Sequence, residues 1–285
     1  MRGRPLGTSP NPSLLRRGFP ELIAFWRTLL QREALGSCPL NTKYCILNTS
    51  TAMHSKGQYV EKLFASIAPK YDLLNSLLSF GLHKQWRRTA IRECALTPGN
   101  TALDVAAGTL ELSIMMSEIV GSGGAVTAVD FCVPMLEIGR RKLEDRGIGN
   151  VSTVEGNAES LPVESDSFDC AIIGFGLRNV SDVQKTLSEM VRAVKSGGRV
   201  VSLELFLPDN RFFARIYEMY FARALPIIGG VVSGDRESYQ YLPESVARFR
   251  TKVELKAMME SAGLAGVTVL DLTGGVAAVH VGVKP

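Results

Sequence analysis

A turn of small residues, a carboxylate and a second polar turn are the parts of this sequence that could bind a ligand. Gly108 lies in a small-residue turn that follows one expected strand and opens a helix. Asp130 ends the next expected strand, 22 residues after Gly108, and Asn157-Ala158 follows the third. The backbone N–H groups of such a turn can face a ligand, Asp130 can accept hydrogen bonds from a ribose diol, and the Asn157 amide can bond to the edge of a base. Together these groups suit an adenosine. The glycine pattern that cradles a pyrophosphate is absent from this turn, so a ligand without phosphates is favoured.

These residues also have structural interpretations. An Asp at the end of a strand often caps a helix or forms a turn. An Asn-Ala pair alone is weak evidence for a ligand. Their order along the chain, however, is typical of enzymes that use S-adenosylmethionine. We therefore predict S-adenosyl-L-methionine as the cofactor.

Short β-branched runs alternate with longer helical patterns, and this alternation predicts the architecture that positions these residues. Strands are expected at residues 101–106, 125–130, 151–155, 168–175 and 199–206, and helices at 110–120, 134–146 and 183–194. Strands separated by helices at this spacing indicate βαβ units and a doubly wound, mostly parallel sheet of the Rossmann-like α/β class. A helix at 252–262 and strands at 267–272 and 276–283 predict a C-terminal antiparallel hairpin.

Two segments differ from this alternation. Residues 1–52 are rich in Arg, Pro, Ser and Thr, and we expect an unstructured extension. It is either an organelle transit peptide or a reading frame whose true start is Met53. The domain at 53–285 is expected to begin with a helical cap, 55–97, and to carry an insertion, 208–245, that covers the site.

Charge and cysteine content exclude several classes of function. Residues 1–52 carry seven basic and two acidic residues, whereas the rest of the chain carries 25 basic and 26 acidic residues. A nearly neutral body gives no electrostatic reason to bind nucleic acid. The five cysteines lack the spacing of a zinc site, so no metal is expected. No apolar run is long enough to span a membrane, and we expect a cytoplasmic protein with at most peripheral contact at the inner membrane, or an organelle-matrix protein if 1–52 is a transit peptide.

Several long motifs resemble those of the ubiquinone/menaquinone biosynthesis C-methyltransferase family. Residues 71–86, YDLLNSLLSFGLHKQW, resemble its first signature, and residues 192–199, RAVKSGGR, resemble its second. The similarity continues through FGLRNV at 175–180, YLPES at 241–245 and LTGG at 272–275, and covers roughly residues 55–285. The resemblance implies a class I S-adenosylmethionine methyltransferase fold.

It also implies a reaction and a set of contacts. The reaction is methyl transfer from S-adenosylmethionine to a ring carbon of a polyprenylated quinol, either demethylmenaquinol or 2-methoxy-6-polyprenyl-1,4-benzoquinol. Matched positions imply cofactor contacts from Thr109, Asp130, Asn157 and Ala158. Gly108 and Asp104, which belong to the same strand and turn as Thr109, are also predicted to bind the cofactor. Two positions depart from the family: Leu110 replaces a glycine, and Gly174 stands where the family usually has serine. We expect Leu110 to crowd the cofactor, so that its exchange for glycine would tighten binding.

The implied chemistry needs a proton acceptor and a stabiliser of negative charge, because a quinol ring carbon attacks once an adjacent hydroxyl is deprotonated. Arg178 and Asn179 follow the fourth expected strand and are the favoured stabilisers of a phenolate. Their structural interpretation is a salt bridge or a helix cap. His83 is the alternative base, although it could be a packed residue at a helix start. Asp72 and Tyr71 are further candidates.

Two rival functions are weighed against this prediction. One is methylation of another acceptor, such as a sterol, a small phenol or an amine. The other is a non-catalytic subunit of a quinone-biosynthesis assembly, which the departures at Leu110 and Gly174 motivate. The predicted partner is a prenylated quinol, and a homodimer or a biosynthetic complex is left open. The apolar run within residues 212–228 could line a channel for the prenyl tail or touch a membrane.

Overall fold

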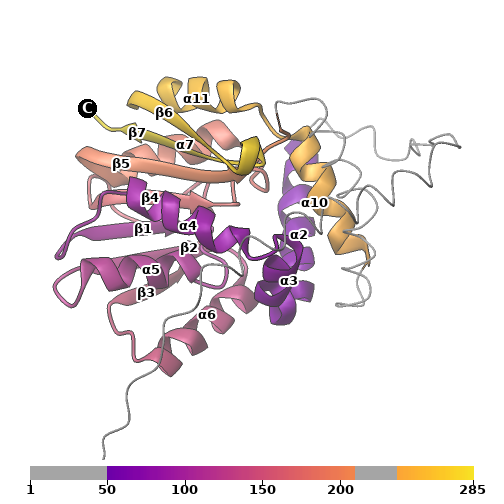
Figure 1. Cartoon of the computed structure of the whole chain (residues 1–285), viewed down its shortest axis with the longest axis horizontal. Coiled ribbons are helices and arrows are strands. Elements are labelled where there is room, and N and C mark those ends of the chain that lie inside the picture. Colours follow the sequence, from indigo (N-terminus) through magenta and orange to yellow (C-terminus); the bar gives the residue numbers. More distant parts are fainter. Residues whose placement is uncertain (1–49, 209–235) are drawn as a thin grey trace, which may run out of the picture. The chain divides into compact units, whose positions relative to one another are not determined.

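The computed structural model describes residues 50–208 and 236–285, and in this part of the chain the strands form one seven-stranded sheet (Figure 1). The order is β3-β2-β1-β4-β5-β7-β6, in which β7 pairs antiparallel with both β5 and β6 and the other pairs are parallel. The bounds are β1 Thr101–Val105, β2 Ala125–Asp130, β3 Val151–Glu155, β4 Phe168–Gly174, β5 Val194–Leu205, β6 Ala265–Leu272 and β7 Ala277–Val283. The predicted doubly wound sheet with a C-terminal antiparallel hairpin is confirmed.

The strand order reverses beside β1. β2 and β3 lie on one side of β1, whereas β4 and β5 lie on the other. A doubly wound sheet binds its ligand in the crevice that such a reversal leaves beyond the carboxyl ends of the strands. The small-residue turn around Gly108 leaves β1 at this point, so the topology itself brings the predicted cofactor residues together.

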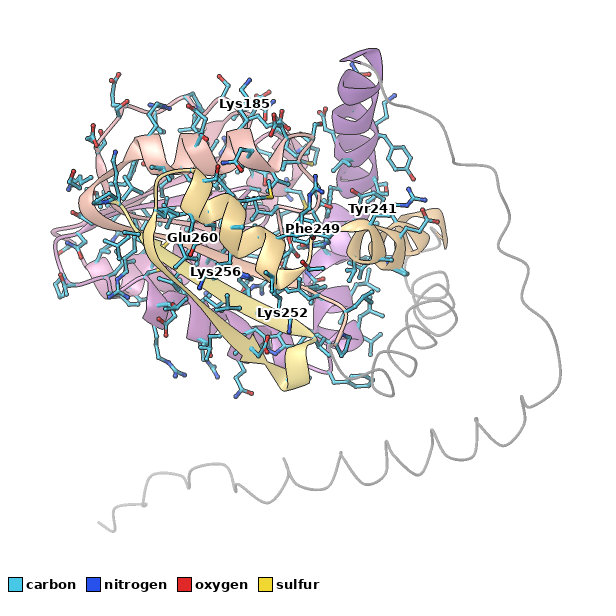
Figure 2. All side chains as sticks on the ribbon, turned by 90° about the horizontal axis from the view of Figure 1, so that it is seen from above. Lys185, Tyr241, Phe249, Lys252, Lys256 and Glu260 are labelled. Carbon is cyan, nitrogen blue, oxygen red and sulfur yellow. The ribbon has the colours of Figure 1, made fainter. Side chains whose placement is uncertain are left out.

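Helices cover both faces of the sheet (Figure 1). One face carries α4 (Leu82–Glu93), α5 (Glu111–Val120) and α6 (Val133–Arg146), and the other carries α7 (Val183–Ala193) and α11 (Lys252–Ser261). Figure 2 shows α11 lying over the hairpin, with Lys252, Lys256 and Glu260 following one another along it. Because the central strands are buried on both faces, their sequences are nearly continuous apolar runs.

Side-chain caps explain where two of these helices begin. Asp182 precedes α7 and its carboxylate accepts a hydrogen bond from the Lys185 N–H at 2.9 Å. Thr251 precedes α11 and forms a reciprocal capping box with Glu254. Such caps satisfy N–H groups that have no partner inside the helix.

A second group of helices lies beyond the carboxyl ends of the strands (Figure 1). It consists of α2 (Ser50–Ile67), the 3-10 turn η2 (Ala68–Lys70), α3 (Tyr71–Leu78) and α10 (Arg236–Arg248). The first three elements and α4 account for most of the segment 55–97 that was predicted to be helical. Of the predicted extension at 1–52 the structure describes only residues 50–52. Of the predicted insertion at 208–245 it describes residue 208 and residues 236–245, which belong to α10, whereas the apolar run lies outside the described residues. No helix among the described residues is long and apolar enough to cross a membrane.

Candidate functional site

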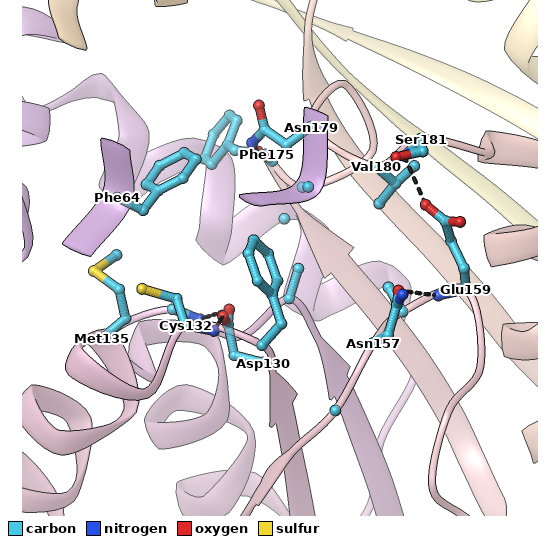
Figure 3. A pocket seen from close by; sticks show the side chains of 18 of the residues that line it. Phe64, Asp130, Cys132, Met135, Asn157, Glu159, Phe175, Asn179, Val180 and Ser181 are labelled. Atoms are coloured by element: carbon cyan, nitrogen blue, oxygen red, sulfur yellow. Dashed lines mark hydrogen bonds between the residues drawn. The ribbon is translucent and has the colours of Figure 1, made fainter. Parts of the chain in front are cut away.

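The largest cavity among the described residues has a volume of about 520 Å³ and lies at the carboxyl ends of β1 to β4 (Figure 3). Each of these strands delivers one element of its wall, because the chain turns away from the sheet at this end of the strands. Gly108 follows β1, Asp130 ends β2, Asn157 follows β3 and Gly174 ends β4. Phe64 of α2 closes the cavity from the helical group. A volume of roughly 300–1,000 Å³ is usual for small-molecule sites.

Asp130 holds the turn after β1 and faces the cavity. Its Oδ2 accepts a hydrogen bond from the Gly108 N–H at 2.7 Å, and its Oδ1 accepts one from the Cys132 N–H at 2.8 Å. Burial raises the pKa of this carboxyl, and the backbone donors act in the opposite direction. Each carboxylate oxygen has a second lone pair, so the group can also accept hydrogen bonds from a diol in the cavity. The turn-forming and ligand-binding interpretations of Asp130 are therefore compatible.

Asn157 and Ala158 line the same cavity. The Asn157 Oδ1 accepts a hydrogen bond from the Glu159 N–H at 2.8 Å, which leaves its amide NH₂ for a ligand. Glu159, which sequence reasoning missed, accepts hydrogen bonds from the Ser181 N–H at 2.6 Å and the Asp182 N–H at 3.1 Å. These contacts join the turn after β3 to the start of α7 across the cavity (Figure 3).

Asp104 and Thr109 do not line the cavity, in contrast to Gly108. The Asp104 carboxylate is fully buried and accepts a hydrogen bond from the Ser113 Oγ at 2.5 Å. Burial raises the pKa of Asp104 to about 7. The Thr109 hydroxyl donates to the Asp72 Oδ1 at 2.8 Å. In this structure both side chains therefore support the turn from behind and do not face the cofactor cavity.

Leu110 is turned away from the cavity as well. Its backbone is in the left-handed region, with φ of 64°, and its side chain is fully buried. A Cβ placed on Gly139 of α6 would lie 2.2 Å from the Leu110 Cγ, so the leucine packs directly on that glycine. The expectation that Leu110 crowds the cofactor is therefore wrong. The strained backbone retains the conformation that a glycine would adopt, while the side chain fills a space between α5 and α6.

Replacing Leu110 by glycine is expected to lower the free energy of unfolding by up to about 4 kcal/mol, because a lost leucine side chain costs about 2–5 kcal/mol and the relieved left-handed strain returns about 1–2 kcal/mol. Leu110→Ala is the matched control. It loses the same contacts but keeps a Cβ, so it should be less stable than Leu110→Gly by about 1–2 kcal/mol. Denaturant unfolding and calorimetry with S-adenosylmethionine test both variants. Tighter cofactor binding in Leu110→Gly at unchanged stability would contradict this account.

Gly174 has a steric explanation. A Cβ at this position would lie 2.5 Å from the Leu112 Cδ1. Glycine thus leaves room for the leucine beside the cavity. The hydroxyl expected from the family is missing here, but the position remains part of the cavity wall.

A second cavity of about 220 Å³ adjoins the first, and Tyr71 and Phe175 line both. Its other walls come from α3, α4 and the end of the hairpin. They include the apolar Trp86 and Leu242 and the polar His83 and Arg178. Two of the predicted catalytic residues therefore meet in one apolar chamber next to the predicted cofactor site.

Arg178 forms a buried ion pair, as its structural interpretation expects, but the sequence did not predict Glu204 as the partner. Its Nη1 lies 2.6 Å from the Glu204 Oε1, and the two side chains are 6% and 0% exposed. Burial is the largest effect on the pKa of Arg178 and lowers it, but the electrostatic effects of Glu204, Tyr71 and Tyr241 and the hydrogen bond to Glu204 together outweigh burial, so the pKa is raised. The Arg178 Nε is buried without a hydrogen-bond partner among the described residues. The sequence signal for Glu204 is that it is the one charged residue in the mostly apolar stretch 200–205 of β5.

Phe175, between the two cavities, has a positive φ of 60°. Its N–H donates to the Leu203 carbonyl at 2.7 Å. Its carbonyl accepts hydrogen bonds from the Arg178 Nη1 at 2.5 Å and the Asn179 Nδ2 at 3.2 Å. The Asn179 Oδ1 in turn accepts one from the Tyr241 hydroxyl at 3.2 Å. Asn179 lines the first cavity rather than the second and holds the strained turn, so the structure separates it from Arg178, with which it was predicted to act.

His83 and Asp72 differ in their surroundings. The His83 Nδ1 lies 2.6 Å from the Ser79 Oγ. Burial, followed by the charges of Arg87 and Lys84, lowers the pKa of His83 to about 4. Asp72 lies in neither cavity, and its Oδ2 is 2.6 Å from the Lys142 Nζ. The structure thus places a neutral histidine in the second cavity and gives Asp72 a place in an ion-pair cluster.

Comparisons with known proteins agree with this geometry. Residues 52–284 match the model of the ubiE/COQ5 methyltransferase family. The chain is 44% identical over 230 residues to the ubiquinone/menaquinone biosynthesis C-methyltransferase UbiE of Hahella chejuensis, covering 80% of this chain and 92% of that protein. It is 44% identical over 236 residues to the protein of that name from Haemophilus ducreyi, covering 82% and 91%.

Solved structures match the fold at lower identity. A SAM-dependent methyltransferase from Aquifex aeolicus has 20% identity and a TM-score of 0.53, covering 70% of this chain and 89% of that one. A SAM-dependent methyltransferase from Thermotoga maritima has 21% identity and a TM-score of 0.56, covering 79% and 100%. These likenesses confirm the fold class predicted from the sequence.

Proposed function

Because this chain belongs to the ubiE/COQ5 methyltransferase family, we propose that it transfers a methyl group from S-adenosyl-L-methionine to a ring carbon of a polyprenylated quinol, with demethylmenaquinol as the acceptor. The observation that carries the proposal is the pair of adjoining cavities. The first cavity is lined by the carboxylate of Asp130 at the end of β2, and the second is largely apolar and is lined by Arg178 and His83. The relatives' names also include ubiquinone biosynthesis, which favours 2-methoxy-6-polyprenyl-1,4-benzoquinol as a second acceptor.

The residues around the first cavity fit the cofactor. Asp130 would accept hydrogen bonds from the ribose hydroxyls, and the Asn157 amide would meet a polar edge of the adenine. Phe64, Phe131 and Met135 offer apolar surface for the flat base. When bound, S-adenosylmethionine supplies an electrophilic methyl group.

The second cavity would hold the quinol ring. Its apolar walls exclude water and suit an aromatic ring with a hydrocarbon tail. The unpartnered Arg178 Nε would donate to the ring oxygen as it loses its proton, and the charge of the guanidinium would stabilise the phenolate. Neutral His83 would accept the hydroxyl proton, because an imidazole with a lowered pKa has a free lone pair at neutral pH. Phenolate resonance then places negative charge on the ring carbon that takes the methyl group.

A methyl-transfer assay with the full chain tests the proposal. The reduced quinol should gain one methyl group from labelled S-adenosylmethionine, whereas the oxidised quinone should not react. Quinones extracted from a deletion strain would identify the acceptor, since the unmethylated precursor accumulates. Binding of the cofactor with no transfer to either quinol would favour the rival non-catalytic subunit.

Asp130→Ala is expected to weaken cofactor binding about 10- to 100-fold, because charge-assisted hydrogen bonds of about 1.5–3 kcal/mol are lost and about 1.4 kcal/mol corresponds to ten-fold. Asp169→Ala is the matched control. Asp169 also accepts a backbone hydrogen bond, from the Thr101 N–H at 2.7 Å, but lies at the other end of the sheet. Calorimetry should show unchanged cofactor affinity for this control. Wild-type affinity in a folded Asp130→Ala variant would place the ribose elsewhere.

The acceptor's tail also implies a location. A polyprenylated quinol resides in a bilayer, so we propose that the enzyme meets its acceptor as a peripheral protein at the membrane surface.

A further inference from the structure

The short helix α3 has large apolar side chains on both of its sides. Leu74 and Leu78 face inward and are buried. Leu73 and Leu77, four residues apart and therefore on one side of the helix, are 62% and 45% exposed. Phe80, directly after the helix, is 61% exposed. We call Leu73, Leu77 and Phe80 the α3 face.

This exposure is concentrated in one place. Among the described residues, nine large apolar side chains are exposed, and three of them fall within residues 73–80. Single exposed apolar side chains are ordinary on protein surfaces, whereas a cluster indicates a binding surface. The α3 face therefore calls for a partner with an apolar component.

The α3 face is continuous with the mouth of the second cavity. Asn75, Leu78, Ser79 and Phe80, from the same helix and the turn that ends it, line that cavity. Phe80 therefore belongs both to the exposed surface and to the cavity wall. An apolar chain that leaves the cavity past Phe80 emerges beside Leu73 and Leu77 rather than into open water.

The charge around the α3 face differs from the charge of the rest of the domain. Residues 70–92 contain five basic residues and one acidic residue, Asp72, which is paired with Lys142. The remainder of 53–285 contains 20 basic and 25 acidic residues. The basic side chains Lys70, Lys84, Arg88 and Arg92 are exposed. The stretch of chain that holds the apolar side chains is thus basic on a domain that is otherwise negative, and Lys84 lies in the first turn of α4, directly after the turn that holds Phe80.

We propose that the α3 face docks on an anionic phospholipid bilayer, with Leu73 and Leu77 entering the headgroup region and the surrounding cations meeting lipid phosphates. Apolar side chains flanked by Lys and Arg bind such a surface through the burial of apolar area and through electrostatic attraction to anionic lipids. A second copy of this chain is disfavoured as the occupant, because a two-fold contact would bring two positive surfaces together. The opening of the second cavity then faces the layer in which a prenyl tail resides.

The inference rests on the proposed function only for the identity of the lipid acceptor. Vesicle binding can be measured without cofactor or acceptor, so the two can fail separately. Methylation of a soluble quinol that lacks a prenyl tail measures the proposed function alone. A wild type that methylates the soluble quinol but does not bind vesicles would overturn the docking surface. A wild type that binds vesicles but methylates no quinol would overturn the proposed function.

The experiment compares vesicle partitioning of the full-length wild type with that of Leu73→Ser/Leu77→Ser. Vesicles contain phosphatidylcholine, alone or mixed with phosphatidylglycerol. Wild type should bind the mixed vesicles, and the double variant should bind at least about ten-fold less well, because the apolar contribution is gone. Residues 1–52 carry a net charge of +5 and are unchanged in the variant, so the leucines decide the result. Lys84→Gln should weaken binding to the mixed vesicles only, and added salt should do the same.

Val269→Ser/Leu270→Ser is the matched control, since these residues on the edge strand β6 are 38% and 43% exposed and line neither cavity. It should partition as wild type does. Equal partitioning of wild type and Leu73→Ser/Leu77→Ser would overturn the proposal. So would a wild type that ignores anionic vesicles, or one that forms dimers in sedimentation experiments that the leucine variant cannot form.

Discussion

Replacing Arg178 by alanine is expected to lower kcat by about 10²–10³, as removal of an oriented donor to a developing oxyanion typically does. The physical reason lies in the guanidinium, because Arg178 lines the second cavity and its Nε has no hydrogen-bond partner among the described residues. Glu204 holds this guanidinium in place, so it is oriented before a phenolate forms. Cofactor affinity should change little, because Arg178 does not line the first cavity.

Stability must be separated from catalysis in this test. Arg178→Ala leaves the Glu204 carboxylate buried without its partner, which costs about 3–5 kcal/mol in comparable ion pairs. Arg178→Gln/Glu204→Gln removes both charges together and should restore much of the stability. The double variant should nevertheless keep the deficit in kcat. A folded double variant that turns over at the wild-type rate would show that Arg178 acts on the fold alone.

The sheet could be predicted because each strand and helix carries its own local pattern. The expected ranges for β2 and β3 match the observed strands, and most other ends differ by one or two residues. β5 is the exception, since it begins at Val194 rather than Arg199. Phe168 pairs with Val194 and Cys170 with Arg199, so residues 195–198 bulge out of the ladder. A Gly-Gly pair predicts a turn locally, and only pairing with β4 extends the strand through it.

The cofactor side of the site could be predicted for a related reason. Asp130 and Asn157 follow strands, and the carboxyl ends of parallel strands meet at one edge. Thr109 was predicted to contact the cofactor, but its hydroxyl donates to Asp72 of α3 and does not face the cavity. The sequence does not show how α3 packs against the turn that holds Thr109. Leu110 lies in the core for a different reason, since its left-handed backbone directs the side chain onto Gly139 of α6.

The acceptor side depends on contacts between segments far apart in the chain. The second cavity joins α3, α4, the end of β4 and the Thr273–Gly275 turn, and the Trp86 Nε1 donates to the Thr273 Oγ1 at 2.8 Å across it. The local periodicity of a sequence predicts helices and strands but does not predict which distant elements contact each other. From the sequence, His83 is only the alternative base, because the sequence does not show where α4 lies relative to Arg178. The structure places it in the same cavity as Arg178.

His83→Ala is therefore expected to lower kcat about 10²- to 10⁴-fold, the usual contribution of a positioned general base. The pH dependence gives the more specific test. Burial is the largest cause that lowers the pKa of His83 to about 4, Arg87 and Lys84 lower it further, and Glu111 and Asp72 act in the opposite direction. The imidazole is then neutral at pH 7 and stays so as the pH falls through 6.5, its unperturbed value.

The wild-type rate should accordingly lose its base near pH 4 rather than near 6.5, and His83→Ala should lack this acid limb. The pH dependence of stability follows the same group. Between pH 6.5 and about 4 the unfolded chain binds a proton at His83 that the folded chain does not, so this contribution to stability falls as the pH falls through that window. Initial rates must therefore be taken on enzyme held near neutrality and diluted into acid at the moment of assay. An acid limb that persists unchanged in His83→Ala would assign the proton to another acceptor and leave Arg178 as the residue that sets the rate.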